Sequence, residues 1–230
     1  MQMVILCGGL ATRLGNLSKR IPKSMIQIEG KSFLEYQIEN LKKYSIKDII
    51  LCVGHLSEKI ENYFGNGEKL GVNIKYSYDR EKLLGPMGAV KNAESKLEEV
   101  FFIMYGDSYI SIDFQKVYAF FIKNNKLGLM VVYKNYDKYD NSNLSVKDNM
   151  VIGHKASGIT DNINYIDYGT SVLRRKSLNL ISEDTFCSTE QFFIKLIIKK
   201  ELLAYEANKR FYHIGTPNSL EEFREFIKNQ

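Results

Sequence analysis

The chain has 230 residues, of which 44% are hydrophobic and 26% charged, a composition that can bury a core and argues against disorder. The net charge of +5 comes from 32 Lys and Arg scattered among 27 Asp and Glu, without an RNA-recognition signature or zinc-finger spacing. No apolar run reaches the roughly 18 residues of a membrane helix, residues 1–7 lack the features of a signal peptide, and three cysteines cannot form a disulfide framework. The mild basic excess suits anionic small molecules as well as nucleic acid, so charge alone does not decide the partner. Reduced thiols predict a cytoplasmic protein, and we expect neither a nucleic-acid nor a membrane partner.

The first half alternates apolar runs with helical patterns. Strands are predicted over 3–7, 48–53, 72–78 and 100–105. Helices are predicted over 32–44, 57–64 and 86–97. In the first of these helices Ser32 is the expected N-cap, and Glu35 three residues later completes the pattern of a capping box. This βαβαβ order predicts a parallel sheet with helices on both faces.

The second half has shorter and more irregular elements. Helices are predicted over 114–124, 176–182, 188–199 and 217–228. Strands are predicted over 128–133, 143–147, 150–154 and 165–173, and the short alternating ones favour antiparallel pairing. The expected fold is therefore α/β and Rossmann-like, with a mixed, mainly parallel sheet, helices on both faces and small antiparallel additions.

A loop rich in glycine and cations follows the first strand. It reads Gly8-Gly-Leu-Ala-Thr-Arg-Leu-Gly15, and Lys23 comes soon after it. Ligands of open α/β sheets bind at the carboxyl ends of the strands, where paired glycines let backbone N–H groups approach an anion. Both the dinucleotide fingerprint and the Gly-Lys-Ser/Thr end of a P-loop are absent from this loop. The loop predicts a phosphate site of another class, with Arg13 and Lys23 as its cations.

Several motifs together resemble one family. Ile5-Leu-Cys-Gly-Gly-Leu-Ala-Thr-Arg-Leu14 and Ile21-Pro-Lys-Ser-Met25 resemble the Gly-Gly-x-Gly-Thr-Arg-Leu and Pro-Lys-Pro-Met strings of sugar-1-phosphate nucleotidylyltransferases. Leu84-Gly-Pro-Met-Gly-Ala-Val90, Tyr105-Gly-Asp107 and Phe211-Tyr-His-Ile-Gly-Thr-Pro217 stand where that family has its later motifs. The resemblance spans nearly the whole chain and is nearest to heptose- and mannose-1-phosphate guanylyltransferases. It implies the nucleotide-diphospho-sugar transferase-like fold.

The resemblance also implies an activity. Family members transfer a nucleotidyl group from an NTP to a sugar 1-phosphate, which releases pyrophosphate and forms an NDP-sugar. The similarity favours GTP and an acceptor of the heptose or mannose type, with Mg²⁺ as cofactor. One domain, 1–230, would comprise a nucleotide-binding half, 1–110, and an acceptor-binding half, 111–230. Relatives are often dimers or tetramers, so a homo-oligomer is compatible with the resemblance.

The resemblance assigns roles to individual positions. The catalytic positions are Arg13, Lys23 and Asp107, and Asp107 would also bind Mg²⁺. The nucleotide-binding positions are Leu6, Gly8, Gly9, Ala11, Thr12, Arg13 and Gly85. The acceptor-binding positions are Gly88, Lys155, Asp167, Tyr168 and Gly169.

Three departures from the family pattern leave alternatives open. Pro86-Met87 replace Thr-Ala/Gly, 165–169 replaces an Asn-Ala-Gly motif, and His213 stands where the family has a second metal carboxylate. Because Mg²⁺ prefers oxygen ligands, either Asp107 with phosphates and water holds the metal or another acid assists. One alternative is a cytidylyltransferase that acts on a non-sugar phosphate. The other is a non-catalytic nucleotide-binding regulator that has lost metal binding.

Overall fold

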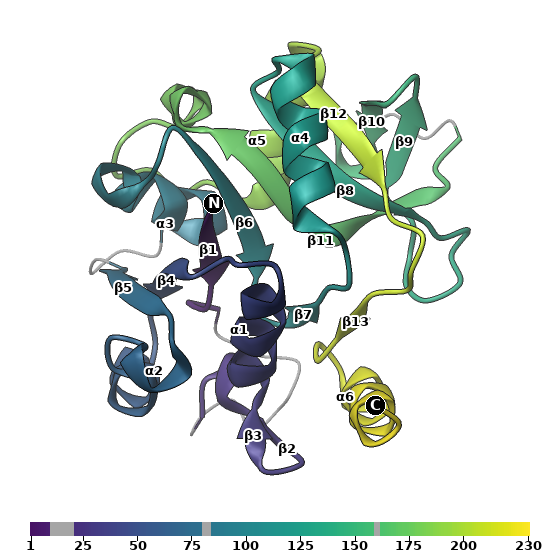
Figure 1. Ribbon diagram of the computed structural model, residues 1–230. Coiled ribbons are helices and arrows are strands. Elements are labelled where there is room, and N and C mark those ends of the chain that lie inside the picture. The colour runs from purple at the N-terminus through teal and green to yellow at the C-terminus, as the bar shows by residue number, and fades with distance from the viewer. Residues whose placement is uncertain (10–20, 80–83, 159–161) are drawn as a thin grey trace.

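A mixed sheet forms the centre of the computed structural model, which describes residues 1–9, 21–79, 84–158 and 162–230 (Figure 1). Within these ranges the sheet has nine strands, in the order β5 (Asn73–Tyr78), β4 (Asp48–Val53), β1 (Gln2–Leu6), β6 (Val100–Tyr105), β11 (Tyr165–Arg174), β8 (Gly128–Lys134), β12 (Leu202–Glu206), β10 (Met150–His154) and β9 (Leu144–Lys147). The first four are parallel, as are β8 and β12, while the other neighbours pair antiparallel. The α/β fold with antiparallel strands from the second half confirms the predicted class.

Strand β1 shows how both faces of the sheet are buried. Met3 and Ile5 contribute to one apolar cluster and Val4 to another, and all three side chains have no exposed surface. Helices α1 (Phe33–Lys43), α2 (Ser57–Phe64) and α4 (Phe114–Asn124) pack in the first cluster, and α3 (Gly85–Asn92) and α5 (Thr189–Ile198) in the second. Burial on both faces explains why the parallel strands are continuous apolar runs rather than alternating ones.

A third apolar cluster holds the last helix, α6 (Pro217–Lys228), beside two small sheets. One sheet pairs β7 (Ser108–Tyr109) with β13 (Tyr212–His213), and the other pairs β2 (Gln27–Ile28) with β3 (Lys31–Ser32). The Phe223 ring of α6 packs edge-on against Phe33 of α1, with ring centroids 4.9 Å apart. Figure 1 shows α6 next to β13 and apart from the nine-stranded sheet. This packing brings the end of the chain to the carboxyl end of β6.

Most predicted elements coincide with observed ones, and the differences concern short segments. The expected helix over 86–97 is divided, because α3 ends at Asn92 and a 3₁₀ turn follows over Glu94–Lys96. Residues 176–182 were expected to be helical, and a 3₁₀ segment occupies Arg175–Leu180. Strand β12 was not predicted at all. Its short apolar run directly follows a helix, where periodicity alone does not separate strand from helix.

The N-terminus of α1 confirms part of the predicted capping box. The Ser32 hydroxyl accepts from the Glu35 N–H at 3.3 Å, which confirms the predicted N-cap. The Glu35 carboxylate lies against α2 instead of closing the capping box, and it accepts from the Tyr63 hydroxyl at 2.8 Å. A tertiary contact has therefore replaced the reciprocal half of the box.

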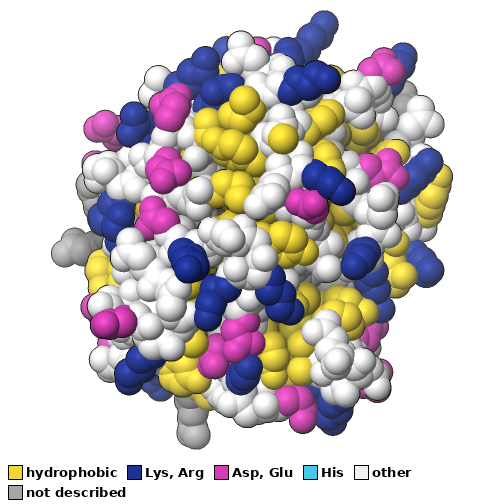
Figure 2. Space-filling view, in the orientation of Figure 1, with side chains coloured by type: hydrophobic (Ala, Val, Ile, Leu, Met, Phe, Trp, Pro, Cys, Tyr) yellow, Lys and Arg dark blue, Asp and Glu magenta, His cyan; other side chains and the backbone are white. Residues whose placement is uncertain are grey.

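The surface carries charges of both signs. On the face that Figure 2 shows, Lys and Arg side chains are interspersed with Asp and Glu. Among the helices of the described ranges, none combines the length and the hydropathy that crossing a membrane would require.

Candidate active site

A cavity of about 360 Å³ opens at the carboxyl ends of the four parallel strands. Its walls include residues at or just after each strand end: Leu6, Gly8 and Gly9 at β1, Cys52 in β4, Asp79 after β5 and Asp107 after β6. Lys23, Gly85 and Tyr105 also line it. Cys7 is a further lining residue, and burial raises the pKa of its thiol to about 12, which leaves it neutral and non-nucleophilic. The cavity occupies the edge where open α/β sheets bind ligands.

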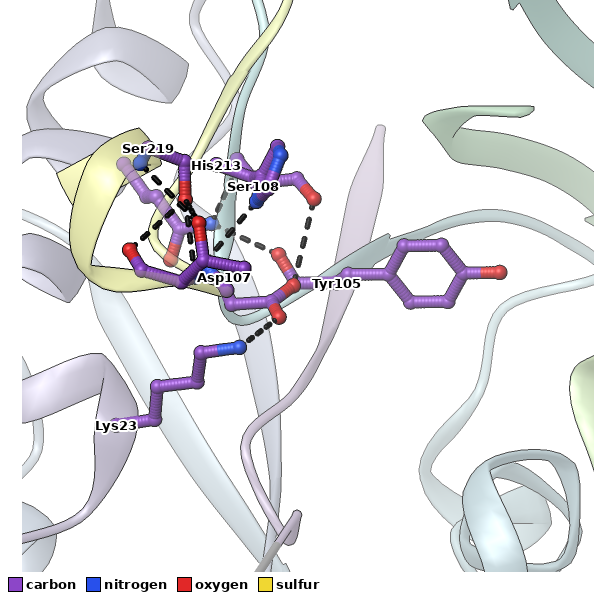
Figure 3. Close-up of polar contacts among 9 residues, drawn as sticks. Lys23, Tyr105, Asp107, Ser108, His213 and Ser219 are labelled. Atoms are coloured by element: carbon purple, nitrogen blue, oxygen red, sulfur yellow. Dashed lines mark hydrogen bonds and ion pairs between the residues drawn. The ribbon is translucent and has the colours of Figure 1, made fainter. Parts of the chain in front are cut away.

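A cation and a carboxylate meet inside this cavity. The Lys23 Nζ donates to Asp107 Oδ2 at 2.5 Å, and Figure 3 shows the two side chains pointing toward each other. Lys23 opens a 3₁₀ turn over Lys23–Met25, and Asp107 lies in the turn between β6 and β7. The Ser108 hydroxyl donates to the other Asp107 oxygen at 3.4 Å. A partly buried Lys–Asp pair at a strand end offers both a donor for phosphate and an oxygen ligand for a divalent cation.

His213 lies beside this pair, opposite Ser108 in the β7–β13 ladder. Its Nδ1 accepts from the Gly215 N–H at 3.0 Å. Burial lowers the pKa of His213, against an opposing effect of the Asp107 charge, so the neutral imidazole is favoured. A neutral imidazole whose Nδ1 accepts carries its proton on Nε2. His213 therefore presents a hydrogen-bond donor and not a metal ligand.

The side chains present in the cavity limit how a metal ion could be bound. Among the described residues, no group of three or more His, Cys, Asp and Glu side chains is arranged to hold a metal ion. Mg²⁺ commonly takes one or two protein carboxylates and completes its shell with water and substrate phosphate. Asp107 fits that mode of binding, in which the substrate supplies most of the oxygens.

Asp167 does not line the cavity, but it accepts a hydrogen bond from Tyr105, which does. The Tyr105 hydroxyl donates to Asp167 Oδ2 and the Gly169 N–H donates to Asp167 Oδ1, both at 2.8 Å. Burial raises the pKa of Asp167 to about 6, although the two hydrogen bonds lower it. Gly169 has a φ of +93°, and a Cβ there would lie 2.9 Å from the Cβ of Ser108. Glycine is thus required for the close approach of β11 to the residue that follows Asp107.

The other three predicted acceptor residues do not line the cavity either. Tyr168 has no exposed surface, and its hydroxyl donates to the Arg210 carbonyl at 3.4 Å, because it faces the core side of β11. Gly88 packs against the chain near Thr185, whose carbonyl oxygen would lie 3.1 Å from an added Cβ. Lys155 is exposed at the start of a 3₁₀ turn beyond β10. None of these three residues lies with the pair of Lys23 and Asp107 in the cavity.

The remaining predicted positions divide into two groups. Leu6, Gly8, Gly9, Gly85, Lys23 and Asp107 line one cavity. Ala11, Thr12 and Arg13 lie outside the described residues, so their roles stay predictions.

Among the lining residues that were not predicted, Asp79 and Phe186 show two different reasons for the omission. Asp79 directly follows β5, so the rule that ligands bind at the carboxyl ends of the strands could have found it. Phe186 lies in the loop before α5 and remains 56% exposed at the cavity. No local pattern marks such a loop residue, because only the tertiary fold brings it beside Gly85.

Comparison with known proteins agrees with this geometry. Residues 2–145 match the family model described as nucleotidyl transferase. The D-glycero-alpha-D-manno-heptose 1-phosphate guanylyltransferase of Campylobacter jejuni is 34% identical over 230 residues, which cover 100% of both chains. The protein of that name from Aneurinibacillus thermoaerophilus is 32% identical, covering 95% of this chain and 94% of its own. A crystal structure of HddC from Yersinia pseudotuberculosis complexed with GMP-PN has a TM-score of 0.82 at 25% identity, covering 98% of this chain and 99% of that one. With a family match over more than half of its length and a full-length relative at this identity, the chain belongs to the nucleotidyl transferase family.

Proposed function

We propose that this protein transfers a guanylyl group from GTP to a sugar 1-phosphate of the heptose or mannose type, forming a GDP-sugar and pyrophosphate. The observation that carries the proposal is the cavity in which Lys23 and Asp107 form a pair at 2.5 Å beside Gly8 and Gly9. Full-length similarity to two heptose 1-phosphate guanylyltransferases supports the choice of base and sugar.

The reaction needs alignment and charge neutralisation more than proton transfer. A phosphate oxygen of the acceptor is already ionised at neutral pH and attacks the α-phosphorus of the NTP, so no general base is required. As the new O–P bond forms, the bond from the α-phosphorus to the oxygen that bridges to the β-phosphate breaks, and pyrophosphate leaves with that oxygen. A lysine ammonium has three donors, and Asp107 takes one of those of Lys23. The others can neutralise charge on the reacting phosphates.

Asp107 has two roles in this proposal. It positions the Lys23 ammonium, and it would hold Mg²⁺ together with phosphate and water oxygens. The metal would supply further charge neutralisation at the phosphates. Arg13, which lies outside the described residues, is proposed as the cation on the leaving pyrophosphate.

The two halves of the chain have separate tasks in this proposal. Residues 1–110 bind the nucleotide, and the cavity supports this because most of its lining residues come from that half. Residues 111–230 bind the acceptor, with Asp167 and Gly169 close to the cavity through Tyr105 and Ser108. We place the activity in the cytoplasm, and the free thiols of all three cysteines are compatible with a reducing compartment.

The test is pyrophosphate release with Mg²⁺ across GTP, CTP, UTP, ATP and dTTP, each offered with sugar 1-phosphates and small organic phosphates. The proposal predicts turnover with GTP and a heptose or mannose 1-phosphate. Turnover only with CTP and a non-sugar phosphate would make the protein a cytidylyltransferase instead. Nucleotide binding without turnover, in calorimetry over the same panel, would favour a non-catalytic regulator.

A further inference from the structure

A short turn of the backbone carries Asp107 from β6 to β7. It lies between Tyr105, the last residue of β6, and Ser108, the first residue of β7. The Gly106 N–H donates to the Leu6 carbonyl of β1 at 3.0 Å, and a Cβ at Gly106 would lie 2.6 Å from that oxygen. The turn therefore packs closely against β1, and the direction of the Asp107 side chain depends on how this turn is held.

Gln37 of α1 is bonded to both ends of this turn. Its Nε2 donates to the Tyr105 carbonyl at 2.9 Å and to the Ser108 carbonyl at 2.8 Å. Both hydrogens of the amide are thereby used on the two residues that flank Gly106 and Asp107. Gln37 has no exposed surface, so water does not compete for these bonds. Figure 1 shows α1 beside β7, which is the arrangement that this contact requires.

The oxygen of the same amide is left without a donor. Gln37 Oε1 is buried, and nothing in the described part of the chain donates to it. Exchanging the nitrogen and the oxygen of the amide would bring Oε1 against the carbonyl oxygens of Tyr105 and Ser108, so these two carbonyls fix its orientation. An unpaired buried acceptor lowers stability. Stability alone therefore does not explain a glutamine here, whereas the turn held by its Nε2 does.

A further backbone bond reaches the turn from the residue after β13. The Ile214 N–H donates to the Asp107 carbonyl at 2.9 Å. With its own carbonyl and both flanking carbonyls bonded, the backbone of Asp107 is fixed, and its carboxylate accepts from Lys23 Nζ at 2.5 Å. The bonds of Gln37 are the part of this arrangement that a side-chain substitution can remove.

A second buried amide on α1 makes the same kind of bond at a different place. Asn40 Nδ2 donates to the Ile110 carbonyl at 2.7 Å, just after β7. Residues three apart lie on one face of a helix, so Gln37 and Asn40 both face the segment that follows β6. Asn40 is only 7% exposed. It therefore fastens α1 to this segment as Gln37 does, without bridging the turn of Asp107.

We infer that Gln37 is the positioning residue of Asp107, and that its amide holds the turn in the shape that directs the carboxylate at Lys23 and at a divalent cation bound with the substrate. This inference rests on the proposed function and names a residue on which that function depends. Gln37 does not line the cavity, so it acts through the backbone that it holds. Mg²⁺ requires near-ideal ligand geometry, and a misplacement of about 1 Å at a reacting centre costs on the order of 10²-fold in rate.

The test compares Gln37→Met with a matched control, Asn40→Leu. Each substitution replaces a buried amide by an apolar side chain of similar size and leaves the residues that line the cavity unchanged. Initial rates of pyrophosphate release from GTP and a heptose or mannose 1-phosphate are measured over a titration with Mg²⁺. Binding of Mn²⁺ in the presence of the non-cleavable α,β-methylene analogue of GTP is followed by electron paramagnetic resonance, which does not depend on turnover.

The two variants should differ in metal dependence and resemble each other in stability. Gln37→Met should lower kcat by about 10- to 100-fold, and it should raise the half-maximal Mg²⁺ concentration and the Kd of Mn²⁺ by about tenfold or more. Asn40→Leu should keep both metal dependences within about threefold of wild type, while urea unfolding shows a comparable loss of stability. A merely structural role of Gln37 would affect the two variants alike.

The outcomes separate this inference from the proposed function. Equal metal dependence of the two variants, or wild-type metal dependence in Gln37→Met, would overturn the positioning role and leave guanylyl transfer standing. If wild-type protein binds Mn²⁺ with the analogue but releases no pyrophosphate, the proposed function fails, and the binding comparison still tests Gln37. If wild-type protein binds neither, both are wrong.

A second variant covers the case in which Gln37→Met does not fold. Gln37→Glu has nearly the same shape as the wild-type side chain. Its buried carboxyl group, placed against two carbonyl oxygens, favours the protonated form and keeps one donor. The Kd of Mn²⁺ should then rise in the same direction by a smaller factor than in Gln37→Met. An unchanged Kd in folded Gln37→Glu would contradict the role of Gln37.

Discussion

Lys23 and Asp107 form an ion pair at 2.5 Å although 84 residues separate them in the chain. Asp107 follows β6, and Lys23 begins the 3₁₀ turn after Pro22, so the pair joins a strand end to the segment behind the first loop. Their side chains are 18% and 35% exposed, so water screens the two charges less than at an open surface. Removing either charge deprives the other of its ion-pair partner among the described residues.

Replacing Lys23 with alanine tests its role at the reacting phosphates. We expect turnover to fall by about 10²- to 10⁴-fold, because the variant loses a cation that neutralises charge in the transition state. The measurement is steady-state pyrophosphate release at saturating substrates. Lys123→Ala, on the exposed side of α4, is the control that should keep wild-type rates. A loss below about threefold in Lys23→Ala would place this side chain outside the reacting centre.

Asp107→Asn removes the carboxylate and nearly preserves its shape. We expect Mg²⁺-dependent turnover to be nearly abolished, since the amide is a weaker ligand for the metal and no longer balances the Lys23 charge. Folding should be intact, as judged by circular dichroism and a thermal unfolding curve. Undiminished turnover across a Mg²⁺ titration would refute the proposed metal role.

His213→Asp tests whether this position neighbours the metal. An aspartate can accept from the Gly215 N–H as the imidazole does, and it adds an oxygen ligand beside Asp107. We expect activity to be kept or raised, with half-maximal rate at a lower Mg²⁺ concentration than in the wild-type protein. The measurement is the rate as a function of Mg²⁺ concentration. A complete loss of activity in a folded variant would indicate a specific role for the imidazole N–H.

Asp167 makes stability depend on pH in a defined window. Its pKa is raised to about 6 in the folded protein, against about 3.9 in an unfolded chain, so the folded state binds the proton more tightly. The contribution of this group to the free energy of unfolding is therefore fully present below about pH 4 and is lost as pH rises through about 6. Relative to wild type, Asp167→Asn should become more stable by up to about 2–3 kcal/mol across that window.

Urea unfolding at several pH values measures this difference. Subtracting the wild-type curve from that of Asp167→Asn removes the titrations that the two proteins share. The difference should grow between about pH 4 and pH 6 and stay constant above that range. A difference that does not change with pH would contradict the raised pKa.

Several predicted positions line one cavity, and local rules with the family resemblance were sufficient to name them. Lys23, Asp107 and the glycines at 8, 9 and 85 line one cavity because each belongs to a motif tied to a strand end or to the loop behind it. A parallel sheet brings such ends to one edge, which explains why positions named by the loop pattern and by the family resemblance lie together.

The orientation of the predicted acceptor-binding residues could not be inferred from the local sequence. Asp167 and Tyr168 are neighbours, yet one bonds to Tyr105 at the cavity and the other lies in the core, because adjacent strand residues face opposite sides. Which of the two faces the site is decided by the antiparallel register of β11 on β6 and β8, which also shifts between Asp167 and Ser171. Long-range pairing of this kind cannot be inferred from one strand's sequence.

The most direct test of guanylyl transfer follows the α-phosphate itself. Purified protein with Mg²⁺ and a heptose or mannose 1-phosphate is given GTP labelled with ³²P at the α-position or, separately, at the γ-position, and the products are separated by chromatography. We expect the α-label to appear in a GDP-sugar and the γ-label in pyrophosphate, with both signals lost in Asp107→Asn. Label released as GMP without a sugar, or α-label that stays in GTP with every acceptor offered, would contradict it.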